Sequence, residues 1–156
     1  CLLSLAKLFQ DRKLGTSQRA YAMYFMARSA FEQGDMDKTN IWGQEALSMF
    51  LLEGQDQTRV KDCLRLLIES TARGKHWRNA LGWALELEKH MKPEDVEWDA
   101  ARYRRAEIHK ALGETKEWRA ILTELAQKNP KGLTGRLATS ALSSEAIETL
   151  AKKYSQ

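Results

Sequence analysis

The sequence contains very little proline, glycine or cysteine. Among its 156 residues there are 2 Pro, 9 Gly and 2 Cys. So few cysteines exclude a disulfide-stapled scaffold, and so little glycine and proline excludes a collagen-like or low-complexity chain. Because these two residues interrupt helices, their scarcity favours long helices over turn-rich β structure. We therefore expect an all-α fold.

A long hydrophobic run is also missing. The uncharged apolar stretches are only a handful of residues long, far below the ~20 that a membrane-spanning helix needs. With 43% hydrophobic and 29% charged residues, the composition is that of an ordinary globular domain. No membrane-spanning segment is expected in this chain.

The charge of the chain is only mildly unbalanced. It has 25 Lys plus Arg against 21 Asp plus Glu, a formal net charge of +4. A dedicated nucleic-acid binder concentrates far more positive charge on one surface. The densest basic stretches, residues 59–78 and 102–110, are explained by solvated helical faces, with an anionic partner as the alternative. Nucleic acid is therefore not the expected partner.

The residues that usually carry catalysis or bind metals do not cluster in the sequence. His76, His90 and His109 have no second ligand at metal-binding spacing, and Cys1 and Cys63 are too far apart to form a zinc site. No glycine-rich phosphate loop and no nucleophile elbow is present. Cys63 lies in an amphipathic stretch and is predicted to be a small buried hydrophobe. We predict no catalytic residue, no cofactor and no metal, so the chain is not expected to be an enzyme.

A repeat becomes visible once the glycines are placed along the chain. Gly34, Gly74 and Gly113 lie 40 and 39 residues apart, and each follows and precedes a helical pattern of apolar residues. Pro93 and Pro130 close two of the units, since a helix does not continue through proline. The repeating unit is therefore predicted to be helix, tight turn, helix.

These signals divide the chain into five segments. Three complete helix pairs are predicted at residues 16–56, 57–93 and 94–131. Residues 1–15 look like the second helix of a truncated preceding repeat, and residues 132–156 are expected to form C-terminal capping helices. Within that last segment, two short helices are predicted, at 133–142 and 144–154. The architecture is an α-solenoid of antiparallel helix pairs.

The pattern resembles the tetratricopeptide repeat (TPR) family, which places small residues inside both helices, a Gly-Asp-like turn between them and a closing proline. The second unit fits after a one-residue slip at Gly74-Lys75, and Trp118 stands where the family usually has a small residue. The longer repeat leaves a different helical-pair repeat such as HEAT open, and the ending at 125–130 resembles repeats of bacterial envelope-assembly proteins. The matching positions are Ala27, Gly34-Asp35, Ala46-Leu47, Ala106, Gly113-Glu114 and Pro130.

The resemblance implies a right-handed superhelix whose first helices line a concave groove. Aromatic rings there would supply contact area, and arginine side chains would bind carboxylates of a peptide or partner domain. The alternative is that these positions are solvated faces, with Phe31 in the core. The implied groove residues are Tyr24, Arg28, Phe31, Arg65, Glu69, Arg73, Tyr103, Glu107 and Lys110.

The expected function is a non-enzymatic protein–protein interaction scaffold. Because the chain opens at Cys1 directly in a helical pattern, we expect it to be part of a longer protein, with a mature lipoprotein as the alternative. Self-association through the exposed N-terminal helix or Trp83 is a further expectation, and the cell envelope is favoured over the cytoplasm. Two other functions stay open: a helical-repeat RNA-binding module, and an accessory domain whose active part lies outside this chain.

Overall fold

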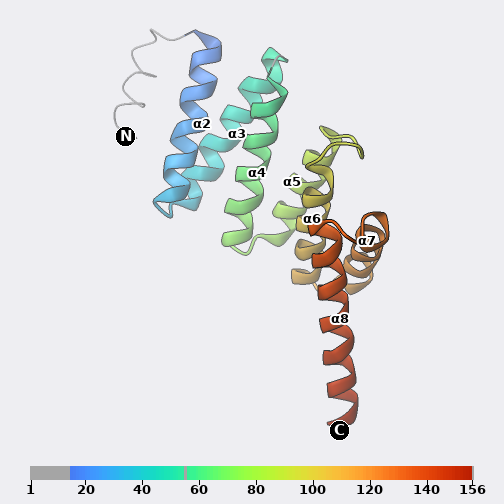
Figure 1. Cartoon of the computed structure of the whole chain (residues 1–156). Coiled ribbons are helices and arrows are strands. Elements are labelled where there is room, and N and C mark those ends of the chain that lie inside the picture. Colours follow the sequence, from blue (N-terminus) through green and yellow to red (C-terminus); the bar gives the residue numbers. More distant parts are fainter. Residues whose placement is uncertain (1–14, 55, 156) are drawn as a thin grey trace. The chain divides into compact units, whose positions relative to one another are not determined.

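The computed structural model describes residues 15–54 and 56–155, and within these ranges every regular element is a helix (Figure 1). The expectation of an all-α fold is confirmed. The helix predicted within residues 1–15, and the self-association surface assigned to it, fall outside the described residues. The seven described helices are α2 (Thr16–Glu32), α3 (Met36–Glu53), α4 (Gln57–Arg73), α5 (Trp77–Lys89), α6 (Trp98–Ala111), α7 (Thr115–Lys128) and α8 (Leu133–Tyr154).

The described part of the chain forms two compact units, one that ends at His90 and one that begins at Met91, and each is described separately. In the first unit, α2 packs on α3, α3 on α4 and α4 on α5. Figure 1 shows these four helices side by side with alternating direction, as expected for two consecutive antiparallel pairs. The helix pairs therefore fall within the predicted segments 16–56 and 57–93.

Small residues at the helix contacts let the first unit pack closely. Ala27, Ala46 and Ala80 have no exposed surface. At Gly43 in α3, an added Cβ would lie 3.0 Å from Cδ2 of Leu67 in α4, so these two helices approach closely there. The rest of this core is aliphatic and aromatic, and it includes Met23, Met26, Leu47, Phe50, Val60, Cys63, Leu64, Leu67, Ile68, Ala84 and Leu87.

The turns inside the three helix pairs share one backbone geometry. In the first, Gly34 adopts φ 83°, and the N–H of Asp35 donates to the carbonyl of Ala30 at 2.9 Å. In the third, Gly113 adopts φ 78°, and the N–H of Glu114 donates to the carbonyl of His109 at 2.9 Å. Such left-handed turns satisfy helix carbonyls that would otherwise have no partner.

The second turn differs in the residue that takes the left-handed position. Gly74 has φ −77°, and the neighbouring Lys75 carries φ 60°. The N–H of His76 donates to the carbonyl of Thr71 at 2.9 Å, as in the other two turns. The slip at Gly74-Lys75 is therefore real, and Gly74 itself is not the left-handed residue. The left-handed residues lie 41 and 38 positions apart.

In the second unit, α6 packs on α7, and α8 packs on both. Trp118 is 2% exposed and fills the position where a small residue was expected. His109 is buried, with Nδ1 3.1 Å from Oε1 of Glu114 and Nε2 3.3 Å from Nη1 of Arg105. It therefore joins the α6–α7 turn to α6, an arrangement that the sequence pattern did not indicate. The core of this unit is Ala106, Trp118, Ile121, Leu122, Leu125 and Ala138.

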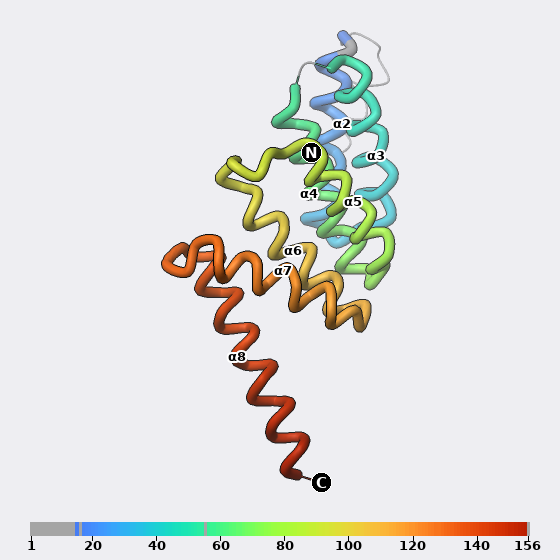
Figure 2. The backbone as a smooth tube through the Cα atoms, turned by 90° about the vertical axis from the view of Figure 1, so that its right-hand side faces the viewer, coloured from blue at the N-terminus to red at the C-terminus, as the bar shows by residue number. Residues whose placement is uncertain are grey.

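The prediction of two short helices after residue 132 is wrong. Residues Leu133–Tyr154 form one continuous helix, α8. Serine is compatible with a helix interior, so Ser143 and Ser144 do not end the helix. All residues from 146 to 155 are exposed. Figure 2 shows this part of α8 extending away from α6 and α7. No helix in the described ranges is both long and apolar enough to cross a membrane.

The strained turn residue gives a testable prediction. Lys75→Gly should raise the free energy of unfolding by about 0.5–1 kcal/mol, because glycine adopts a positive φ without a steric penalty. The measurement is urea denaturation followed by circular dichroism. Lys75→Ala is the matched control, since alanine keeps the penalty. A glycine variant no more stable than the alanine variant would contradict the assignment.

Candidate functional site: a groove between α2 and α4

One open groove lies between the first helices of the first two pairs. It has a volume of about 350 Å³ and is formed by α2 and α4. We call it the α2–α4 groove. It is lined by Tyr24, Arg28, Phe31, Glu32, Asp62, Arg65, Leu66 and Glu69.

Two aromatic side chains of α2 supply most of the ring surface of the groove. Tyr24 is only 5% exposed, and its burial raises the pKa of its hydroxyl group. Phe31, about two helical turns further along α2, is half-buried. The guanidinium of Arg73 lies 4.1 Å from its ring centroid. Such a cation–π contact holds the arginine at the rim. Of the two rings, that of Phe31 is therefore the more accessible, and the buried ring of Tyr24 lies beneath the groove surface.

Charged side chains of both signs surround these rings. Asp62 links two arginines of α4, with 3.2 Å from Oδ2 to Nη1 of Arg59 and 3.2 Å from Oδ1 to Nη1 of Arg65. On α2, Nη2 of Arg28 lies 3.9 Å from Oε1 of Glu32, and both side chains are mostly exposed. The lining thus holds three carboxylates and two guanidinium groups. The groove has a mixed rather than a basic surface.

A hydrogen-bonded corner fixes the spacing of α2 and α4 beside the groove. The carboxylate of Asp56 caps α4 by accepting the N–H of Arg59 at 3.0 Å, and it also accepts the Tyr21 hydroxyl of α2. This second hydrogen bond lowers the pKa of Asp56 and raises the pKa of Tyr21. The guanidinium of Arg59 lies 5.2 Å from the ring centroids of Tyr21 and Tyr24 and 5.6 Å from that of Phe25. The N-terminus of α4 is therefore attached to one face of α2.

The structure brings most of the predicted groove residues of the first unit together. Five of them line the groove, and Arg73 adjoins it through Phe31. Phe31 is neither fully buried nor free of contacts, so it belongs to the groove rather than to the core. The five lining residues are Tyr24, Arg28, Phe31, Arg65 and Glu69.

The other three predicted residues lie on α6 in the second unit. Tyr103 packs against the core of that unit, and its burial raises the pKa of its hydroxyl. Nζ of Lys110 lies 4.8 Å from the ring centroid of Trp118. Glu107 pairs with Arg104 at 3.4 Å. Tyr103 and Lys110 thus contribute to packing.

Asp62 and Leu66 line the groove but were not among the predicted site residues. A signal for them exists in the sequence, because positions 62, 65, 66 and 69 follow the spacing of a single helix face. The family pattern assigns Arg65 and Glu69 to the groove but does not assign Asp62 and Leu66 to it.

The remaining candidate reactive groups in the described chain are a cysteine and the side chains that could bind a metal ion. Cys63 is fully buried, and burial raises the pKa of its thiol to about 12. This confirms the expectation of a buried hydrophobe. Among the described residues, no three His, Cys, Asp or Glu side chains lie close enough to hold a metal ion.

Comparisons with known proteins support the fold. No protein-family model matches the chain, and no curated protein matches its sequence. Among solved structures, the chain is similar to the C-terminal TPR-containing domain of a Plasmodium falciparum protein described as FK506-binding. That likeness has a TM-score of 0.59 and 17% sequence identity, over 86% of this chain and 97% of that domain. The chain therefore has a TPR-like, all-α repeat fold, as the resemblance in its sequence implied.

The corner at Asp56 should contribute to stability in a pH-dependent way. Asp56→Ala removes the cap of α4 and the acceptor of Tyr21, and it should cost about 1–2 kcal/mol of unfolding free energy at pH 7. Because folding lowers the pKa of Asp56, the difference from the wild type should be complete well above 3.8, the ordinary pKa, and should decrease as the pH falls from there through the lower pKa of the folded state. Urea denaturation at pH 7 and pH 3 measures both effects. Asp37→Ala, at an exposed carboxylate in the first turn of α3, is the control, and an equal cost there would contradict the role of Asp56.

We expect the buried thiol of Cys63 to be unreactive toward alkylating reagents in the folded protein. In a Cys1→Ser variant at pH 8, Cys63 should not react with iodoacetamide while the protein is folded, because the reactive thiolate is almost absent. One thiol should react after denaturation in urea, which is the positive control. Rapid stoichiometric labelling of the folded protein, followed by mass spectrometry, would show that Cys63 is accessible.

Proposed function

We propose that this chain is a non-enzymatic protein-interaction scaffold that binds a peptide segment of a partner protein in the α2–α4 groove. The observation that carries the proposal is the assembly of five predicted groove residues around one open cavity. Their chemistry, two aromatic rings beside arginines and carboxylates, suits a peptide carrying both apolar and acidic side chains.

The arginines can exchange their present partners for a ligand. Arg28 and Glu32 are 51% and 70% exposed and 3.9 Å apart, and such surface pairs are worth only about 0–1 kcal/mol. A peptide carboxylate could therefore replace Glu32 at small cost and form a bidentate contact with the guanidinium. Leu66 and the ring of Phe31, which are both partly accessible, would cover an apolar side chain next to it.

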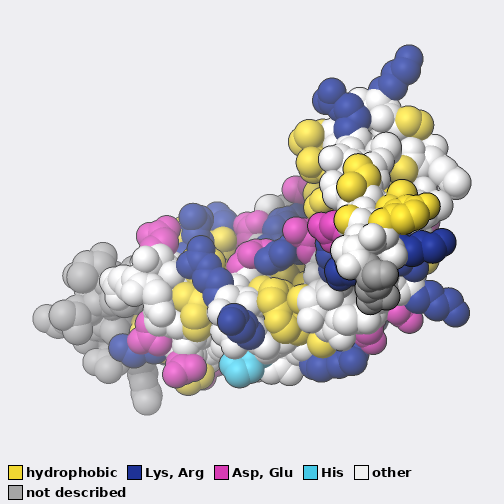
Figure 3. All heavy atoms as spheres, turned by 90° about the horizontal axis from the view of Figure 1, so that it is seen from below, with side chains coloured by type: hydrophobic (Ala, Val, Ile, Leu, Met, Phe, Trp, Pro, Cys, Tyr) yellow, Lys and Arg dark blue, Asp and Glu magenta, His cyan; other side chains and the backbone are white. Residues whose placement is uncertain are grey.

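The charge of the groove favours peptide over RNA. Three carboxylates line it against two guanidinium groups, whereas a nucleic-acid site needs a net positive path for the phosphates. On the face shown in Figure 3, Lys and Arg side chains alternate with Asp and Glu, and exposed hydrophobic side chains lie between them. A cell-envelope location stays a prediction of the sequence.

The proposal is tested by selecting peptides and then reversing charges in the groove. Random peptides displayed on phage are selected against the chain, and the affinities of the selected peptides are measured by fluorescence anisotropy. Arg28→Glu and Arg65→Glu should each weaken binding by about tenfold or more, because a guanidinium–carboxylate contact becomes a repulsion. Circular dichroism shows whether each variant is folded.

Lys116→Glu is the matched control, because it reverses an exposed charge in the first turn of α7, outside the groove. It should leave the affinity within about twofold of the wild-type value, a change worth less than ~0.5 kcal/mol. Unchanged affinity in both arginine variants would exclude the groove as the binding site. Selective, salt-sensitive binding of single-stranded RNA in place of peptides would favour the RNA-binding alternative.

A further inference from the structure

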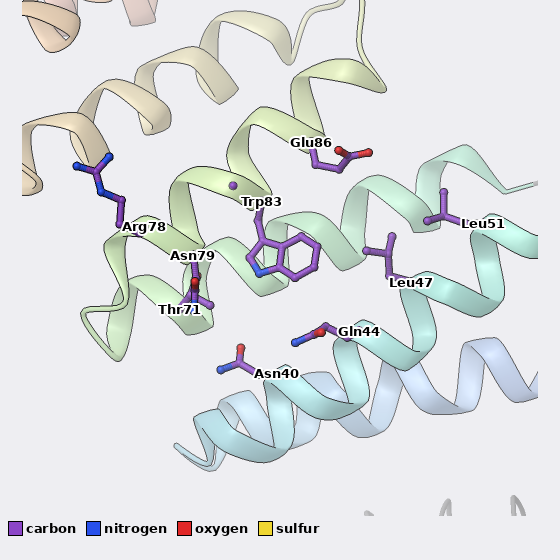
Figure 4. A pocket seen from close by; sticks show the side chains of 10 residues that line it. Asn40, Gln44, Leu47, Leu51, Thr71, Arg78, Asn79, Trp83 and Glu86 are labelled. Atoms are coloured by element: carbon purple, nitrogen blue, oxygen red, sulfur yellow. The ribbon is translucent and has the colours of Figure 1, made fainter. Parts of the chain in front are cut away.

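A second and larger cavity lies in the first unit, between the second helices of its two pairs. Its volume is about 580 Å³, within the range of ligand pockets. It is formed by α3 and α5, with Thr71 of α4 at its base, so it shares no lining residue with the α2–α4 groove. We call it the α3–α5 pocket (Figure 4).

The lining of the α3–α5 pocket combines apolar surface with side-chain amides. Trp83 of α5 lies across the space toward Gln44 and Leu47 of α3 (Figure 4). Asn40 and Asn79 line the same space from the two helices. An indole ring with aliphatic neighbours can cover an apolar side chain, while amide groups both donate and accept hydrogen bonds. This is the set of groups that an extended polypeptide main chain requires.

The amides are available for such contacts. Within the described part of the chain, the side chains of Gln44 and Asn79 form no hydrogen bond or ion pair with protein groups. The amide oxygen of Asn40 accepts the hydroxyl of Ser70, which orients this side chain and leaves its nitrogen to donate. One amide of the pocket, that of Asn40, is thus oriented by the fold, and the amides of Gln44 and Asn79 can turn toward a ligand.

Gly82 gives an independent reason to connect the pocket with a ligand. It lies inside α5 with helical dihedral angles, and an added Cβ would meet no atom within 4 Å. The fold therefore does not need glycine at this position, where alanine would make a more stable helix. Gly82 lines the pocket, and the missing side chain lets another backbone approach α5 closely.

The charges at the two ends of the pocket are unequal. At one end, Glu86 is already near cations, 3.2 Å from Nζ of Lys89 and 3.6 Å from Nε2 of His90. At the other end lies Arg78, an exposed guanidinium five residues before Trp83. Five residues of helix rise about 7.5 Å, which two residues of an extended peptide span. Figure 4 shows the side chain of Arg78 directed away from Trp83, so a carboxylate two positions from the apolar side chain would reach the guanidinium once this exposed side chain turns toward the pocket that it lines.

We propose that the α3–α5 pocket binds an extended polypeptide segment of a partner protein, with an apolar side chain against Trp83 and Leu47 and an acidic side chain two positions away at Arg78. Asn40, Gln44 and Asn79 hydrogen-bond the main chain of the segment. The site is separate from the α2–α4 groove, so one unit can hold two segments at once.

The first experiment measures binding of a fluorescein-labelled peptide, Ser-Gly-Asp-Ser-Leu-Ser-Thr-Gly-Ser, to the full chain by fluorescence anisotropy. We expect saturable binding with a Kd of tens to hundreds of micromolar. Replacing the leucine of the peptide by serine should weaken binding at least tenfold. No saturable binding up to millimolar protein, or equal binding of both peptides, would overturn the proposal.

Variants of the pocket then locate the peptide. Trp83→Ala should weaken binding at least tenfold, and Gly82→Ala should weaken it several-fold while raising Tm by roughly 2–4 °C. The second variant separates a role in binding from a role in stability, since its two effects have opposite signs. Leu85→Ala is the control, because Leu85 is exposed on the same helix outside the pocket. Undiminished binding in both the Trp83 and Gly82 variants would overturn the proposal.

A charge exchange tests the orientation of the segment and distinguishes the two sites. Arg78→Glu should weaken binding of the original peptide and restore binding of a peptide in which lysine replaces aspartate. Because the α2–α4 groove also suits apolar and acidic side chains, binding is compared in Arg28→Glu and Arg65→Glu, where the Trp83-dependent binding of the original peptide should persist. Loss of binding in these two variants, with none in Arg78→Glu, would place the peptide in the α2–α4 groove and overturn the proposal.

Discussion

The reversal of the chain within each helix pair is the constraint on which the rest of the structure depends. Each pair is closed by one left-handed residue, at Gly34, Lys75 and Gly113, followed by a backbone hydrogen bond that returns to the preceding helix. This geometry sets two helices antiparallel at close distance, and the small residues Ala27 and Ala46 then allow their faces to meet. Within the first unit, the first helix of one pair, α2, therefore lies near the first helix of the next, α4.

Two cavities of different chemistry follow from this alternation. The first helices, α2 and α4, enclose a groove with charges of both signs, and Asp56 fixes its edge. The second helices, α3 and α5, enclose a pocket lined mainly by amides and apolar groups around Trp83. In the first unit, one backbone pattern therefore produces two separate cavities that share no lining residue.

Much of this arrangement is predictable from the sequence because the determining interactions are local. Helix periodicity, the glycine at each turn and the closing prolines all act within a few residues, so the helices and their pairing follow from the pattern. The residues of α2 and α4 that face the groove follow from the same periodicity once the pairs are known. The sequence did not predict the continuous helix α8. Serine is common both at helix N-caps and within helices, so Ser143 and Ser144 do not distinguish a break from a continuous helix.

Features that depend on tertiary distance were not predictable. The repeat pattern indicated the one-residue slip at Gly74-Lys75, but it did not indicate that Lys75 takes the left-handed position. The sequence indicates that Trp83 is not part of the buried face of α5. Its partners Gln44 and Leu47 are about forty residues earlier, and no local rule joins them. Tyr103, which the repeat pattern assigns to a groove, is partly buried and packs against the core of the second unit.

The solitary end of α8 has a consequence for how this helix forms. Residues 146–155 are all exposed, and an isolated helix of that length is marginal in water because its first turn is unfavourable to nucleate. The part of α8 that docks on α6 and α7 removes this cost, since it supplies turns that are already formed. The pairing of Arg119 with Glu145 marks where docking ends. Beyond it the helix propagates without support, so amide hydrogens there should exchange with solvent far faster than those around Ala138.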